Sequence, residues 1–166
     1  MILIPKSYFI VQGVGESDLS KINAFDNALN DAGIANYNWV CVSSILPFSA
    51  EEDKSKSLPK EGSILFCVMS RIDGVRGNQI SAAIAVARVI DEKKYKRFGL
   101  VVESTSKEAK GKNLELLLTN KIREMCRLRK TKIVEFKIEQ SKLLKIKKKY
   151  GTALAVVVFN DYEFIT

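Results

Sequence analysis

The chain has 166 residues, of which 46% are hydrophobic and 28% are charged, and its formal net charge is +8. This length and composition are those of a single soluble globular domain and exclude two domains of ordinary size. The sequence contains no histidine, which excludes Ser-His-Asp and Cys-His catalysis and histidine metal ligands. Any catalysis must therefore use carboxylates, hydroxyls, amides, lysine or a cofactor.

Three cysteines, Cys41, Cys67 and Cys126, are scattered among apolar neighbours and lack the close spacing of a zinc site. No apolar run reaches the roughly 20 residues that cross a bilayer, and the first ten residues lack the pattern of a secretory signal. We therefore expect buried free thiols in a reducing cytoplasm, no metal and no membrane partner.

The positive charge is concentrated near the C-terminal end. Between Lys121 and Gly151, the sequence has twelve lysines and arginines but only three glutamates. Such a block binds nucleic acid in some proteins and is a solvated surface in others. It contains few aromatic residues for stacking on bases, which argues against an RNA-reading surface.

The first predicted elements are a strand from Lys6 to Gln12 and a helix from about Lys21 to Ala32. A Gly-x-Gly sequence between them, at residues 13–16, lacks the third glycine and the lysine of a phosphate-binding loop, so we interpret it as a turn. Asp18–Ser20 supplies an N-cap for the helix, and Gly33 supplies its C-terminal stop.

The next predicted strand runs from Asn36 to Ser44. Its apolar run from Trp39 to Val42 indicates a central strand that is buried on both faces. Two adjacent serines, Ser43 and Ser44, end the strand shortly before a proline, which by itself is an ordinary polar strand end. The charged segment 47–59 predicts a surface loop.

The remaining sequence repeats this alternation of strands and one helix. Strands are predicted near residues 62–71, 79–89, 98–103, 132–138 and 152–159, and a helix from a capping box at 105–108 to about Arg129. The element order predicts a mixed α and β chain with mostly antiparallel sheets. Its two similar halves suggest two sheets that pack face to face with a helix outside each, an α+β sandwich.

Several segments also resemble the pyruvoyl-dependent arginine decarboxylases, in the order in which that family has them. They are NAFDNAL (23–29), GIANYN (33–38), SSILP (43–47), ISAAIAVA (80–87), GLVVE (99–103) and YGTALAVVV (150–158). The resemblance implies a four-layer αββα sandwich formed by residues 1–166 as one domain. It also implies that this zymogen cleaves itself between Ser43 and Ser44, giving a β chain (1–43) and an α chain (44–166).

The resemblance further implies the role of each site residue. Ser44 becomes a pyruvoyl group, which forms an imine with L-arginine and accepts electrons as carbon dioxide leaves, so that agmatine is made without pyridoxal phosphate or a metal. Asn38 stabilises the oxyanion at the Ser43 carbonyl during cleavage, and Glu103 returns a proton to the α-carbon. Asp26, together with Asn38 and Ser43, binds the substrate, because a carboxylate and a guanidinium make paired hydrogen bonds.

Two departures from the family pattern leave alternatives open. Asn78-Gln79 stands where many relatives have an acidic residue, and little of the basic segment 107–149 matches. The leading prediction is a cytoplasmic arginine decarboxylase that assembles as a trimer or a dimer of trimers. The alternatives are a nucleic-acid-binding module that uses residues 121–149, and a self-cleaving relative with a different amino-acid substrate.

Overall fold

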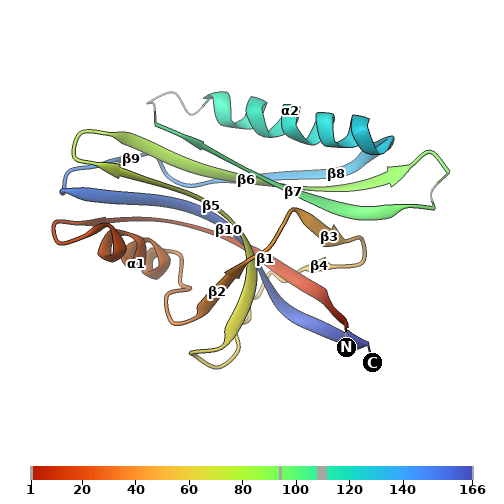
Figure 1. Ribbon diagram of the computed structural model, residues 1–166, viewed down its shortest axis with the longest axis horizontal. Helices are drawn as coiled ribbons and strands as arrows, with labels where there is room; N and C mark the ends of the chain where they lie inside the picture. The colour runs from red at the N-terminus through yellow and green to blue at the C-terminus, as the bar shows by residue number, and fades with distance from the viewer. Residues whose placement is uncertain (1, 94, 108–111, 166) are drawn as a thin grey trace.

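The computed structural model describes residues 2–93, 95–107 and 112–165. Within these ranges the chain forms ten strands in two sheets, together with helices α1 (Lys21–Asp31) and α2 (Lys112–Arg129). Figure 1 shows four layers: α1, one sheet, the other sheet and α2. The predicted α+β sandwich with mostly antiparallel sheets is therefore confirmed.

The first sheet, which α1 covers, has the strand order β2-β5-β10-β1-β4. Its strands span Asn38–Cys41 (β2), Ile64–Val75 (β5), Tyr150–Ile165 (β10), Ile2–Ser17 (β1) and Glu51–Glu52 (β4). The second sheet, under α2, has the order β3-β7-β6-β8, and β9 also pairs with β6. Its strands span Ile45–Pro47 (β3), Arg97–Ser106 (β7), Gln79–Asp91 (β6), Thr131–Gln140 (β8) and Leu144–Lys145 (β9).

Buried side chains fill the gaps between the layers. On β10, Val157 faces the second sheet, whereas Val156 and Val158 pack with the residues that contact α1. Both faces of this strand are thus covered, which explains its continuous apolar sequence. On the other side of the molecule, Leu118 and Ile122 of α2 are fully buried against the second sheet.

The Gly-x-Gly sequence is not a turn, and that prediction was wrong. Gly13 and Gly15 lie inside β1, paired with Leu154 and Thr152 of β10. A Cβ atom at Gly13 would lie 2.2 Å from the carbonyl oxygen of Ala28, and one at Gly15 would lie 2.3 Å from a carbonyl oxygen of the same helix. These glycines are needed because α1 packs directly on the backbone of β1.

The predicted central strand ending in the two serines is also different in the structure. β2 contains only four residues and lies at the edge of its sheet, where it pairs with β5 alone. Val40 and Val42 are each 40% exposed, so the apolar run is not buried on both faces. A short strand at a sheet edge leaves this part of the chain free to turn toward the other sheet.

The second helix begins later than the sequence predicts. Thr105 and Ser106 of the expected capping box lie in β7, while Glu108 falls outside the described residues. α2 is described from Lys112. By contrast, α1 follows the prediction: the Ser20 side chain caps it by accepting a hydrogen bond from the Asn23 amide, and Gly33 follows with φ +74°.

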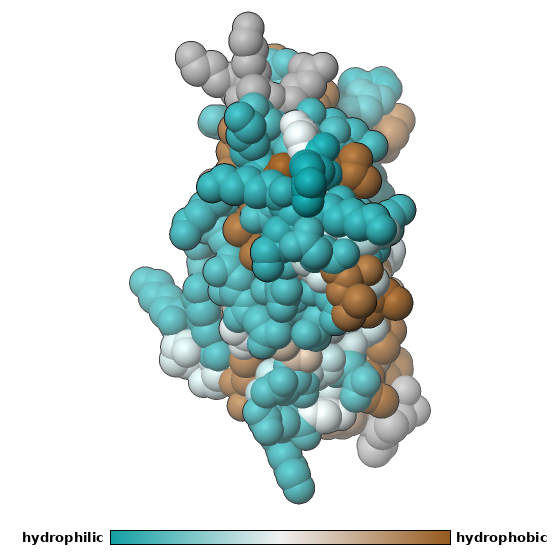
Figure 2. Space-filling model, turned by 90° about the vertical axis from the view of Figure 1, so that its left-hand side faces the viewer, coloured by the Kyte–Doolittle hydropathy of each residue, from teal (hydrophilic) through white to brown (hydrophobic). Residues whose placement is uncertain are grey.

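The basic segment is divided among the end of α2, β8, β9 and the turn before β10. In that turn, the backbone amides of Lys147 and Lys148 donate to the Glu16 carboxylate, and the Lys149 amide donates to Asp18. Figure 2 views the end of the molecule that contains this turn and shows a surface that is mostly hydrophilic. Neither described helix combines the length and the apolar character that a bilayer crossing requires.

Candidate active site

The two serines lie where the chain passes from one sheet to the other. β2 ends at Cys41 in the first sheet, and β3 begins at Ile45 in the second. The Val42 amide donates to the Cys67 carbonyl oxygen at 2.9 Å, so the first ladder continues to Val42. The Ser43–Ser44 peptide bond therefore belongs to neither regular ladder, although hydrogen bonds hold the chain on both sides of it.

The hydrogen bond on the second side comes from Val101 of β7. Its amide donates to the Ser44 carbonyl oxygen at 2.8 Å, just before the β3–β7 pairing of Ile45 with Leu100. The Ser44 side chain is half-buried and that of Ser43 is exposed. Neither hydroxyl has a hydrogen-bond partner within the described ranges, so both are free to rotate toward the peptide bond between them.

Glu103 lies two residues beyond Val101 on β7, a separation of about 7 Å along a strand. The two side chains point to the same side of the sheet, and Val101 is buried between the sheets. Glu103 therefore lies on the sheet face that the serine crossover approaches. Glu103 is thus the next residue on this face of β7 after Val101, whose amide holds the Ser44 carbonyl oxygen.

The surroundings of Glu103 favour its protonated form. The residue has an exposed face, but the protein around it removes enough hydration to raise the pKa of its carboxyl group above the usual value. The positive charge of Lys121 acts in the opposite direction and lowers this pKa. The Lys121 ammonium is held there by a 2.6 Å hydrogen bond to the Glu103 backbone carbonyl. The net effect is a raised pKa for the Glu103 carboxyl group, a shift in the direction that suits a proton donor.

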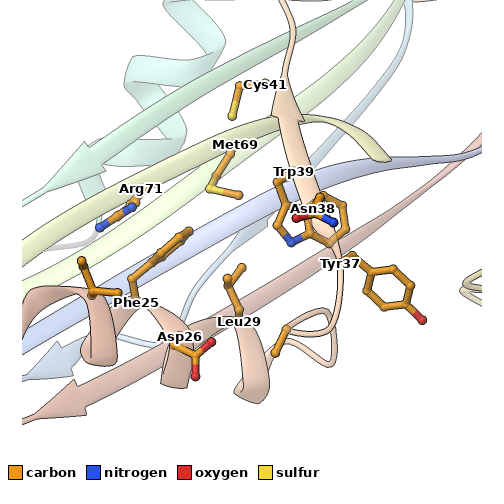
Figure 3. A pocket seen from close by; sticks show the side chains of 11 residues that line it. Phe25, Asp26, Leu29, Tyr37, Asn38, Trp39, Cys41, Met69 and Arg71 are labelled. Atoms are coloured by element: carbon orange, nitrogen blue, oxygen red, sulfur yellow. The ribbon is translucent and has the colours of Figure 1, made fainter. Parts of the chain in front are cut away.

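Asp26 and Asn38 lie in a separate cavity of about 610 Å³ between α1, β2 and β5. Figure 3 shows Phe25 and Leu29 of α1 projecting into it, opposite Met69 and Arg71 of β5, with Trp39 of β2 at its side. The Asp26 carboxylate accepts only a long hydrogen bond, 3.4 Å, from Asn30 Nδ2 within the described chain. It is exposed, so it remains available to a cationic ligand.

Asn38 is already engaged within its own chain. Its side-chain Nδ2 donates to the Gly62 carbonyl oxygen at 2.9 Å and fastens the start of β2 to the turn before β5. Five residues separate it from Ser43, or about 16 Å of extended chain. Its amide therefore does not lie against the Ser43 carbonyl of the same chain.

Arg71 joins the two halves of the site, and the sequence analysis missed it. Arg71 and its neighbour Met69 line both the Asp26 cavity and a second cavity of about 330 Å³ that contains Glu103. The guanidinium lies 3.7 Å above the Phe25 ring and makes two hydrogen bonds to Asp73 rather than to Asp26. The sequence contained one signal for this residue. Arg71 and Asp73 are charged residues two positions apart in a strand that is otherwise mostly apolar, so they lie on the same face and can pair there.

The predicted site residues thus fall into two groups within one chain. Ser43, Ser44 and Glu103 gather around the start of β3 and the middle of β7, whereas Asp26 and Asn38 lie in the cavity under α1. Of the first group, Glu103 lines a cavity that adjoins the Asp26 cavity, because Met69 and Arg71 line both.

Comparisons with known proteins identify the family of the chain. Residues 7–164 match the family described as pyruvoyl-dependent arginine decarboxylase. Proteins of that name from Methanopyrus kandleri and Methanothermobacter thermautotrophicus are each 37% identical, over 94% and 92% of this chain and 97% and 95% of their own lengths. A third, from Archaeoglobus fulgidus, is 44% identical over 52% of this chain and 57% of its own length. The chain therefore belongs to the pyruvoyl-dependent arginine decarboxylase family.

Proposed function

We propose that this protein cleaves itself between Ser43 and Ser44 and then decarboxylates L-arginine to agmatine and carbon dioxide. The observation that carries the proposal is the position of that peptide bond, between two hydrogen-bonded ladders that belong to different sheets. Segments 1–43 and 44–166 each contribute strands to the first sheet. The folded protein can therefore tolerate the break without separating.

The cleavage step uses groups of the chain itself. The Ser44 Oγ attacks the Ser43 carbonyl carbon, the peptide C–N bond breaks, and an ester joins the two residues. Loss of the Ser44 α-proton then eliminates the Ser43 carboxylate and leaves dehydroalanine at residue 44. One water molecule hydrolyses the dehydroalanine, releasing ammonia and leaving a pyruvoyl group. Hydrogen bonds from Val42 to Cys67 and from Val101 to Ser44 restrict both flanks, which supports an attack that depends on proximity.

The residues around Ser44 suit a pyruvoyl group at that position. Such a group condenses with the substrate amine and supplies an electron sink as carbon dioxide leaves, so we propose no pyridoxal phosphate and no metal. The Ser44 carbonyl oxygen would remain as the amide carbonyl next to the new ketone. The Val101 amide, at 2.8 Å from that oxygen, would then donate a hydrogen bond where negative charge develops.

Glu103 is the group we assign to proton return at the substrate α-carbon. It lies two residues along β7 from Val101, whose amide holds the Ser44 carbonyl oxygen. The loss of hydration raises the pKa of its carboxyl group, which is the direction that a proton donor needs. Its neighbour Lys121 is positioned by a backbone contact to the same residue. No other carboxylate among the described residues lines the cavity that Glu103 lines.

Substrate selection is assigned to Asp26, with Asn38 and Ser43 as further binding residues. The exposed Asp26 carboxylate suits a guanidinium, which forms two charge-assisted hydrogen bonds with it, whereas lysine offers no such fork. Phe25 and Trp39 would cover the aliphatic part of the ligand. Because the Asn38 amide does not lie against the Ser43 carbonyl of its own chain, we assign oxyanion stabilisation during cleavage to the Asn38 of a neighbouring protomer.

We further propose that the site is completed across the subunit boundaries of a trimer or a dimer of trimers. The Asp26 cavity and the Ser44 group lie on different sides of the β5 edge, so a neighbouring protomer would supply one of them. Exposed apolar side chains on the β8 edge strand, Val134 at 52% and Phe136 at 38%, support a homo-oligomer. We assign the enzyme to the cytoplasm.

Release of carbon dioxide from carboxyl-labelled amino acids tests this proposal. The wild-type protein should act on arginine and should leave lysine, ornithine and histidine nearly untouched, and Ser44→Ala should be inactive on all four. Activity on another amino acid only would instead identify a self-cleaving relative with a changed substrate. A protein that is cleaved but inactive on the whole panel would contradict arginine decarboxylation.

A further inference from the structure

Two cysteines lie in contact beside the proposed cleavage site. Cys41 of β2 is paired in register with Cys67 of β5, and their Sγ atoms are 3.8 Å apart. Cys41 lies two residues before Ser43, so it would belong to the 1–43 chain, whereas Cys67 would belong to the 44–166 chain. The third cysteine, Cys126, is buried on α2 with the residues of the other sheet.

We propose that Cys41 and Cys67 form a reversible disulfide that links the two chains of the processed protein covalently. This inference rests on the proposed self-cleavage, because only cleavage turns an internal bond into a link between chains. Residues paired on neighbouring strands have Cα atoms about 4.8 Å apart, within the range of roughly 4.4–6.8 Å that disulfides span. Since β2 is a four-residue edge strand paired with β5 alone, a small shift of β2 brings the sulfurs together.

Cys41 is exposed and Cys67 is buried, and this difference determines which thiol reacts first. The prediction of buried thiols is wrong for Cys41, which is exposed because it lies at the end of an edge strand and lines the Asp26 cavity. Its thiolate therefore attacks a sulfur of oxidised glutathione and displaces one glutathione thiolate. Cys67 then loses its proton and attacks the Cys41 sulfur, and the second glutathione thiolate leaves. Two protein thiols are thereby oxidised while one glutathione disulfide is reduced to two thiols.

Burial of Cys67 is compatible with this second step. It is completely buried, and burial raises the pKa of its thiol, so it does not react first with reagents in solution. Its target sulfur on Cys41 is already in contact, so no reagent has to enter the core. Glutathione reverses the bond by attacking at the exposed Cys41 side.

Mass spectrometry of the processed protein tests the proposal. The protein is treated with oxidised glutathione, or with a phosphine reductant as the reference, then alkylated and denatured without further reduction. The oxidised sample should show one species with the summed mass of the two chains less two hydrogens, and the reduced sample should show two chains. Cys41→Ser and Cys67→Ser should give no linked species, while the matched control Cys126→Ser should link as the wild type does.

Two separate chains after oxidation, with Cys41 and Cys67 alkylated or carrying glutathione, would overturn the disulfide. A single chain that persists after reduction would instead contradict self-cleavage. In that sample, peptide mapping still decides whether a peptide containing Cys41 is joined to one containing Cys67. The two claims therefore fail in different ways.

Discussion

The Val101 amide and the Ser44 carbonyl oxygen, 2.8 Å apart, join the strand that carries Glu103 to the proposed cleavage point. This backbone bond holds the residue after the scissile peptide, while the Val42–Cys67 bond holds the chain before it. Whether the fixed geometry leads to self-cleavage and then to decarboxylation can be tested one residue at a time.

Replacing the attacking hydroxyl should stop maturation. Ser44→Ala has no Oγ, so we expect one uncleaved chain of about the full 18.6 kDa mass and no decarboxylase activity. Denaturing gels and intact mass measure both. The matched control is Ser49→Ala, an exposed serine in the following segment, which should mature fully. Cleavage of Ser44→Ala at the same position would rule out Ser44 as the attacking group.

Glu103→Gln should separate maturation from catalysis. The chain should still be cleaved, but kcat should fall by about 10²–10⁴-fold because the proton donor is lost. In the wild type, the donor that we propose is the protonated Glu103 carboxyl group, and loss of hydration raises its pKa. kcat should therefore fall as pH rises through this pKa, and that dependence should vanish in the variant. Glu163→Gln, at an exposed position on β10, should leave the pH profile unchanged.

Asp26→Asn should weaken substrate binding more than it slows the chemical step. Loss of a charged hydrogen-bond acceptor costs roughly 1.5–3 kcal/mol, so we expect KM for arginine to rise on the order of tenfold to a hundredfold. Steady-state kinetics give KM and kcat separately. Glu115→Gln removes the same charge from an exposed position on α2 and should leave KM unchanged. An unaltered KM in Asp26→Asn would remove Asp26 from the binding site.

A methyl group at Gly13 should destabilise the fold. The added Cβ would meet the Ala28 carbonyl oxygen at 2.2 Å, so α1 must move away from β1. We expect Gly13→Ala to lose about 1–3 kcal/mol, which lowers Tm by roughly 2–4 °C per kcal/mol for this chain length. Calorimetry measures the shift against Gln12→Ala, whose exposed side chain lies on the same strand. Equal Tm values would contradict the close packing.

A charge on the β8 edge should break the proposed assembly. Val134 is 52% exposed, and a glutamate there would be unpaired in an apolar interface. We expect Val134→Glu to sediment as a smaller species and to lose activity if neighbouring protomers complete the site. Tyr95→Glu places the same charge at an 85% exposed position in the β6–β7 connection and should sediment as the wild type does. A wild type that sediments as a monomer would refute the trimer.

Much of the architecture was predictable because periodicity determines which faces are buried. The helix pattern of α1, its Ser20 cap and the Gly33 stop all agree with the structure. The Gly-x-Gly sequence misled because a glycine needed for close helix packing has the same sequence signal as one needed for a turn. The prediction that β2 is a buried central strand was wrong because an exposed edge strand near a proposed interface is as apolar as a buried one.

The site was less predictable than the fold. Resemblance to known sequences supplied Ser44, Glu103 and Asp26, but the proximity of Ser44 to Glu103 depends on β3 pairing with β7, which no local pattern reveals. The contact between Cys41 and Cys67 likewise depends on the register of two parallel strands. Arg71 was not predicted as a site residue because β2 pairs with β5 only as far as Cys67, which leaves the edge of β5 uncovered at Arg71. The sequence predicted a longer strand there.

The central claim is that the chain makes its own carbonyl cofactor from Ser44, and the intact mass of the reduced, denatured wild-type protein tests it most directly. We predict two chains, 1–43 and 44–166, the larger of them lighter by one ammonia than a chain that begins with serine. That chain should also take up a hydrazine reagent at its ketone. An active preparation with a single intact chain, or a larger chain with a free N-terminal serine, would contradict the account.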